Sequence, residues 1–141
     1  MGLSKSERER LLAEPHIGAL SVLEQPDRAP LTIPIWYQYT PGGQLWIDTS
    51  PDSRTARAIQ SAGRFTLMVQ RVAPTVRYVS VEGPVTGAEP GGRESAWEMA
   101  ARYLPPDKVA DAVELKETEL SPHIVISMRP QHWISADLGP F

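Results

Sequence analysis

The chain has 141 residues, with 17 acidic side chains against 14 basic ones, three histidines and no cysteine. This length can bury one hydrophobic core, so we expect residues 1–141 to form a single domain. A net charge of −3 argues against nucleic-acid binding. The lack of cysteine excludes disulfides, thiolate nucleophiles and iron–sulfur clusters. No apolar run reaches the roughly 18 residues of a membrane span, and polar residues 1–14 do not resemble a secretory signal, which predicts a cytoplasmic protein.

The first elements carry clear local signals. Ser4-Lys5-Ser6-Glu7 reads as a capping box for a helix that ends near residue 13, before Pro15. The small apolar stretch 17–23 predicts a strand, and residues 24–28 have turn composition.

In residues 31–39, Leu, Ile or Tyr occupies every odd position and a different kind of residue every even one. This period of two is the strongest strand signal in the chain. Pro34 within it predicts an edge position or a bulge, because proline donates no hydrogen bond to a neighbouring strand. Residues 40–43, Thr-Pro-Gly-Gly, predict a turn, after which residues 44–49 return as the next strand.

Ser50-Pro51-Asp52 predicts a second helix, capped by Ser50 and ended by Gly63. Two more strands are expected at 65–72 and 75–86, around Ala73-Pro74.

The last third of the chain predicts a helix at 93–104, a break at Pro105-Pro106 and a further helical piece to about 118, then a strand at 123–128 and a short tail holding Trp133. About six strands with hairpin-length links predict a mainly β protein, with an antiparallel sheet curled into a small barrel and peripheral helices.

Charge is distributed unevenly along the chain. Residues 53–81 hold five arginines and no acid, whereas residues 89–119 hold eight acids and four bases. Within the first stretch, Arg71 and Arg77 flank a turn between strands. The arginines could converge on one anion near the helix that begins at Ser50, or they could form a basic strip that pairs with the acidic segment.

The helix that begins near Ser50 is the best candidate for a phosphate site. A helix N-terminus offers free backbone N–H groups and a positive dipole end, and Arg54 and Arg57 add charge one turn apart. The alternative is an ordinary capped helix with a solvated basic face, and Asp52 could occupy the same N–H groups.

Aromatic residues precede this helix at Trp36, Tyr37 and Tyr39. Planar ligands stack on such rings, but aromatic residues in strands more often belong to the core. Alternation places one of Trp36 and Tyr37 inward and the other outward.

Catalytic side chains are not evident. His16, His123 and His132 lie far apart without acids at metal-ligand spacing, so we expect no metal site. No nucleophile or general acid can be assigned, with Tyr37 and Tyr78 the only candidates for the acid. Any redox chemistry would therefore come from a bound cofactor.

Three segments together resemble the pyridoxamine 5′-phosphate oxidase-like superfamily of flavin-binding split β-barrels, which includes flavin/deazaflavin oxidoreductases. They are Pro34-Ile35-Trp36-Tyr37, Thr49-Ser50-Pro51-Asp52-Ser53-Arg54 and Arg77-Tyr78-Val79-Ser80-Val81-Glu82-Gly83. The similarity covers most of the chain, most strongly residues 11–85. It implies a six-stranded split barrel that forms a homodimer, with FMN or a deazaflavin bound between the subunits.

The resemblance also implies which residues contact the cofactor. The phosphate would lie at the helix start and the ring along the strand that ends at Tyr37, while further residues line the site or the partner's half of it. The implied cofactor-binding residues are Ile35, Trp36, Tyr37, Thr49, Ser50, Ser53, Arg54, Thr55, Arg57, Gln70, Arg77 and Tyr78. Thr55 stands where the family usually has a lysine, which removes one cation from the phosphate site.

The sequence thus predicts an oxidoreductase that transfers hydride to or from a small planar or unsaturated substrate. A flavin or haem carrier without turnover is the alternative, for which one of the three histidines could supply an axial ligand. A barrel that has lost its cofactor and serves as an interaction module is a further alternative, supported by Thr55.

Overall fold

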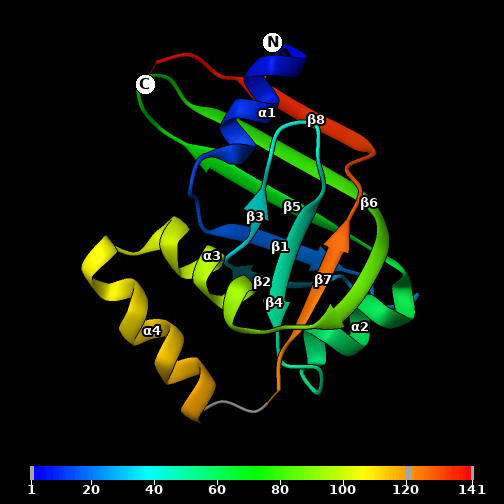
Figure 1. Ribbon diagram of the computed structural model, residues 1–141. Coiled ribbons are helices and arrows are strands. Elements are labelled where there is room, and N and C mark those ends of the chain that lie inside the picture. Colours follow the sequence, from blue (N-terminus) through cyan, green and yellow to red (C-terminus); the bar gives the residue numbers. More distant parts are fainter. Residues whose placement is uncertain (1, 120–121, 141) are drawn as a thin grey trace.

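The computed structural model describes residues 2–119 and 122–140 and places eight strands in one antiparallel sheet (Figure 1). The strand order is β2-β1-β5-β6-β7-β4-β3, with β8 paired to β6 beside this path. The strands are β1 (Gly18–Val22), β2 (Leu31–Ile35), β3 (Gln38–Tyr39), β4 (Leu45–Thr49), β5 (Arg64–Arg71), β6 (Arg77–Pro90), β7 (Ile124–Met128) and β8 (His132–Asp137). The predicted fold class, a curled antiparallel sheet with peripheral helices, is confirmed, although eight strands replace the expected six.

Strand β6 joins the two halves of the sheet. Its first part pairs with β5 and β8, and its last part pairs with β7 after a register shift between Val85 and Gly87. Gly83 lies near the end of the first part, opposite Phe65 of β5, and an added Cβ there would stand 1.8 Å from the carbonyl oxygen of Arg129. Only glycine permits this close approach of the two backbones, so Gly83 allows one strand to serve both halves.

The predicted strand at residues 31–39 is two strands, β2 and β3. The interruption falls at Trp36 and Tyr37, where the Tyr37 N–H donates to the Tyr103 hydroxyl (3.1 Å) instead of to a neighbouring strand. The alternation of exposed and more buried side chains continues through this break, from Pro34 to Tyr37. Pro34 lies in β2 at the end of the strand order, which confirms its predicted edge position.

The expected tail is the eighth strand. Residues His132–Asp137 form β8, which pairs with β6 from Arg77↔Asp137 to Glu82↔His132. Its partner residues lie 50 to 60 positions earlier in the chain. The residues of β8 are exposed or half-buried, so the stretch shows little local pattern of apolar and polar residues.

Within the described part of the chain, the helices are α1 (Lys5–Ala13), α2 (Arg54–Ala62), α3 (Arg93–Tyr103) and α4 (Pro106–Glu119). The Ser4–Glu7 capping box begins α1 as predicted, and Gly63, at φ 76°, ends α2. The predicted start of α2 is wrong by three residues, because Ser53 and not Ser50 is the N-cap. The Ser53 N–H donates to the Ser50 carbonyl in a turn that precedes the helix.

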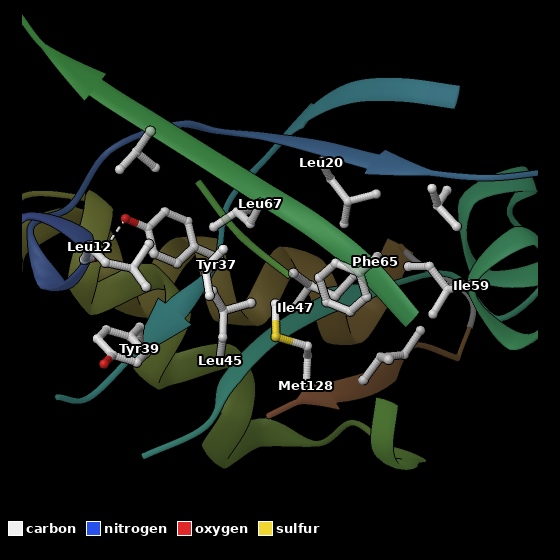
Figure 2. Close-up of a cluster of buried hydrophobic side chains, with 14 of the residues drawn as sticks. Leu12, Leu20, Tyr37, Tyr39, Leu45, Ile47, Ile59, Phe65, Leu67 and Met128 are labelled. Carbon is white, nitrogen blue, oxygen red and sulfur yellow. Dashed lines mark hydrogen bonds between the residues drawn. The ribbon is translucent and has the colours of Figure 1, made fainter. Parts of the chain in front are cut away.

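The main core lies between the curled sheet and helices α1 and α2 (Figure 2). Tyr37 is fully buried there, and its hydroxyl donates to the Leu12 carbonyl (2.6 Å). Side chains from both sheet halves meet in this core, among them Leu20, Leu45, Ile47, Phe65, Leu67, Val79, Val81, Ile126 and Met128.

Helices α3 and α4 form a hairpin with a small core of their own, made of Ala96, Ala100, Val109 and Val113. In Figure 1 this hairpin lies beside the sheet, away from α2. Polar contacts attach it to the barrel. Arg102 donates to the carbonyls of Ala13 (2.9 Å) and Glu14 (2.7 Å), and the Tyr103 hydroxyl donates to the His16 carbonyl (2.8 Å).

Candidate functional site

The start of α2 follows β4 directly and holds the predicted phosphate-binding residues. Ser53 caps the helix by accepting a hydrogen bond from the Ala56 N–H (3.0 Å), and the Thr49 hydroxyl lies 3.2 Å from the Ser53 hydroxyl. Ser50 is exposed in the preceding turn. The structure therefore brings Thr49, Ser50 and Ser53 together at one helix end.

The two arginines of α2 face solvent and have partners within the chain. Arg54 forms a two-pronged ion pair with Glu24, at 2.8 and 2.6 Å, and its side chain is 65% exposed. This hydrogen bonding lowers the pKa of Glu24 below its ordinary value. Arg57 donates to the Asp52 carbonyl (2.8 Å). Both guanidinium groups stay accessible, but an anion at Arg54 would compete with Glu24.

Thr55 faces the other way. It is 7% exposed and lies on the inner side of α2 beside Ala56 and Ile59, which belong to the main core. Because its side chain points into the protein, a ligand at the exposed helix end would meet Arg54 and Arg57 before Thr55.

The remaining arginines of the acid-free stretch are held by different carboxylates. Arg64 pairs with Glu82 (3.3 Å), and Arg71 pairs with Glu14 (2.6 Å). Arg77 pairs with Asp137 (3.0 Å) and Glu7 (3.4 Å). None of these partners belongs to the acidic segment 89–119. Within one chain, the carboxylates that hold Arg71 and Arg77 differ from the one that holds Arg54.

Trp36 and Tyr37 take opposite sides of the chain, as alternation predicts. Tyr37 is buried, and this burial raises the pKa of its hydroxyl far above the ordinary value. Its phenol therefore belongs to the core, which leaves it poorly suited to contact a ligand or donate a proton. Trp36 is 39% exposed and stacks on Tyr103, with ring centroids 4.5 Å apart.

Gln70 and Tyr78 lie opposite each other in the register of β5 and β6, on the outer face of the sheet. A row of small or apolar residues crosses the same face, one from each adjacent strand. In register order the row is Pro34, Ala19, Met68, Ser80 and Ile134. Ile134 is 66% exposed, so this face presents apolar surface to solvent.

A cavity of about 420 Å³ lies beside Trp36. Its lining residues are Ile17, Pro34, Ile35, Trp36, Asp48, Met99 and Lys116, which combine the edge of β2 with β4 and the α3–α4 hairpin. Of the predicted cofactor-binding residues, it contains Ile35 and Trp36. A second cavity of about 470 Å³ lies by the 24–30 turn and the end of α2 and contains none of them.

The wall of the Trp36 cavity includes an ionic cluster that sequence reasoning missed. The Asp48 side chain, 2% exposed, lies 2.9 Å from Lys116 Nζ and 2.7 Å from His123 Nδ1. The pairing of β4 with β7 brings Asp48 near His123, and α4 brings Lys116. No local pattern marks this cluster, because Asp48 lies about 70 positions before Lys116 and His123.

The other histidines have separate surroundings. His16 Nε2 lies 2.9 Å from Glu14, and His132 is exposed, 4.0 Å from Glu82. Among residues 2–119 and 122–140, no three His, Asp or Glu side chains are grouped as a metal site would require. In the same residues, no helix has the length and apolar character needed to cross a membrane.

The two sheet halves joined through β6, with helices at the periphery, form a curled antiparallel barrel, and solved structures share this fold. Comparison with models of known protein families finds no match, and comparison with curated protein sequences finds none either. The likeness therefore lies in the fold.

Solved structures share this fold over nearly the whole chain. A structure described as an F420 reductase is 23% identical, with 89% of this chain and 94% of that one covered and a TM-score of 0.68. A putative pyridoxamine 5′-phosphate oxidase from Listeria innocua is 12% identical, covering 93% and 96%, with a TM-score of 0.61. A heme binding protein from Mycobacterium smegmatis is 21% identical, covering 97% of this chain but 59% of that one, with a TM-score of 0.60.

Proposed function

We propose that this protein is an oxidoreductase that binds FMN or a deazaflavin and moves hydride to or from a small planar or unsaturated substrate. The bound cofactor would supply the hydride chemistry. The chain itself would hold the phosphate, orient the ring and exclude water. The fold shared with an F420 reductase and a putative pyridoxamine 5′-phosphate oxidase supports this class of function.

The observation that carries the proposal is that the two predicted subsites, one for the phosphate and one for the ring, lie at opposite ends of the β1–β2 hairpin. Arg54 lies at the Glu24 end of β1, whereas Ile35 and Trp36 lie at the Gly18 end. The four residue steps from Gly18 to Val22 span about 13 Å at roughly 3.3 Å per residue. An elongated ligand with a phosphate at one end and a ring at the other suits this arrangement.

Each end also has suitable chemistry. Ser50, Ser53, Arg54 and Arg57 combine hydroxyl groups, guanidinium groups and a positive helix end, the donor set that phosphates prefer. At the other end, the edge of the ring would lie along β2 and residues 36–37, next to the cavity beside Trp36. The exposed state of Arg54 supports a role in ligand binding rather than in packing.

A homodimer is part of the proposal, because the apolar row on the outer face of the sheet suits a second copy of the chain. Gln70 and Tyr78 would then reach the partner's cofactor from that face. Light scattering at micromolar concentration should give twice the chain mass, and Ile134→Lys should shift it toward the monomer. Val72→Lys, at an apolar position that is 73% exposed in a turn, is the matched control. A monomeric wild-type protein would contradict this part.

The proposed cofactor can be tested on the purified protein. Its visible spectrum and the mass of any released molecule should identify a flavin or deazaflavin. Arg54→Ala should weaken FMN or deazaflavin binding at least tenfold, about 1.4 kcal/mol, through loss of a charge-assisted hydrogen bond. Arg10→Ala, at an exposed position on α1, is the control. An unchanged dissociation constant for Arg54→Ala would remove the start of α2 from the site.

A haem-binding function without turnover is the second candidate. His123 favours it among the three histidines, because Asp48 contacts its Nδ1 as carboxylates do in many metal-ligating histidines. The fold is also that of a heme binding protein. A Soret band after haem titration, lost in His123→Ala, would support this candidate. A colourless protein that binds neither flavin, deazaflavin nor haem would instead favour an interaction module.

A further inference from the structure

The cavity beside Trp36 has one apolar wall and one charged wall. Ile17 and Trp36 are 56% and 39% exposed, although both are large hydrophobic residues, and both line this cavity. Its volume of about 420 Å³ lies within the range of roughly 300–1,000 Å³ found for small-molecule sites. The exposed apolar surface therefore lies where a small ligand could cover it.

The charged wall consists of Asp48 and Lys116. The Asp48 carboxylate is almost fully buried, and both of its oxygens lie within 2.9 Å of His123 Nδ1. Burying such a group is costly, and apolar contacts would attach α4 to the barrel at lower cost.

Asp48 holds the Lys116 ammonium at the cavity wall. An ammonium has three N–H donors, and the contact with Asp48 at 2.9 Å uses one of them. The Lys116 side chain is 24% exposed, which leaves its charge in reach of a molecule in the cavity. Because the ion pair restrains a flexible side chain in advance, a ligand would lose less entropy on binding it.

Trp36, which also lines the cavity, is restrained as well. Its indole stacks on Tyr103 with an angle of 22° between the rings, and the Tyr103 hydroxyl is bonded to the backbone. The cavity thus places a fixed aromatic surface and a fixed cation around one space.

We propose that this cavity binds a small planar anion, whose conjugated ring lies against Trp36 and Ile35 and whose carboxylate accepts a hydrogen bond from Lys116. This site is separate from the arginines of α2, which lie toward the other end of the β1–β2 hairpin. The inference rests on the proposed function only in that the anion would be the substrate of the oxidoreductase. Binding of the anion requires no cofactor.

The test uses the cofactor-free protein and two probes of equal shape, 2-naphthoate and its neutral amide, 2-naphthamide. Isothermal titration and ligand-observed NMR should show that naphthoate binds at least tenfold more tightly. Lys116→Met should abolish this preference, Lys116→Arg should retain most of it, and Lys108→Met, at an exposed position on the same helix, should leave it unchanged. Trp36→Leu should weaken both probes.

Absence of naphthoate binding to the wild-type protein, or equal affinity for the two probes, would overturn the proposal. So would a preference that survives in Lys116→Met. If Lys116→Met fails to fold, the probe ratio in the wild-type protein and in Lys116→Arg decides the question. Titration of the same samples with FMN tests the proposed cofactor separately, so either idea can fail without the other.

Discussion

The Tyr103 hydroxyl lies 3.1 Å from the backbone nitrogen of Tyr37 and 3.0 Å from its carbonyl oxygen. The hydroxyl accepts a hydrogen bond from this N–H, and its single proton is shared between this carbonyl and that of His16, at the point where β2 ends and β3 begins. The same hydroxyl bonds to the carbonyl of His16, so it joins three parts of the chain.

Tyr103→Phe is expected to destabilise the protein by about 1–3 kcal/mol, because partly buried backbone groups lose their hydrogen-bond partner. Stacking on Trp36 should persist, since the ring remains. Urea denaturation followed by fluorescence measures the change in the free energy of unfolding. A change smaller than about 0.5 kcal/mol, typical of surface substitutions, would show that this contact contributes little.

Gly83→Ala should be strongly destabilising, because the added Cβ would stand 1.8 Å from the Arg129 carbonyl oxygen. Overpacking of this kind costs about 1–3 kcal/mol and sometimes more, since backbone must move. Gly87→Ala in the same strand is the control, because a Cβ there meets nothing within 4 Å. Thermal denaturation of the two variants should separate them clearly, and equal melting temperatures would contradict the role given to Gly83.

Glu24→Gln should strengthen FMN binding, because Glu24 and the cofactor phosphate would compete for Arg54. An exposed ion pair contributes up to about 1 kcal/mol, so the expected gain is about two- to fivefold in the dissociation constant. Glu82→Gln, which removes the partner of Arg64, is the control. Weaker binding in Glu24→Gln would mean that Glu24 positions Arg54 for the ligand.

Stability should decline at acid pH. The pKa of Glu7 is lowered by the Ser4 backbone N–H, that of Glu24 by Arg54 and that of Asp137 by the Gly139 backbone N–H. A lowered carboxyl pKa means that the unfolded chain binds more protons, so stability is lost as pH falls through the folded-state pKa. Melting temperatures should therefore drop below about pH 4.5, the ordinary glutamate value.

Asp137→Asn should reduce this acid dependence, because it removes one of the three carboxylates. Asp27→Asn makes the same charge change at an exposed turn and serves as the control. A melting temperature that stays constant from neutral pH to about pH 3 would contradict the assignment, since linkage requires a loss there.

Local signals account for most of the predicted elements. The capping box at Ser4, the glycine at the end of α2 and the edge proline in β2 each act within a few residues, so the sequence displays them directly. The start of α2 was misplaced because Ser50 and Ser53 are both good caps, and the turn at Pro51 decides between them.

Length, charge and alternation alone established a mainly β protein with an acidic average charge and an acid-free arginine stretch in its middle. Which carboxylate holds each arginine was decided by tertiary structure, because ion pairs join residues up to about 70 positions apart. The same holds for β8 and for the cluster of Asp48, Lys116 and His123. Strand pairing and helix docking create contacts between residues that are close in space but distant in the sequence. The residues next to each partner in the sequence therefore do not indicate such a contact.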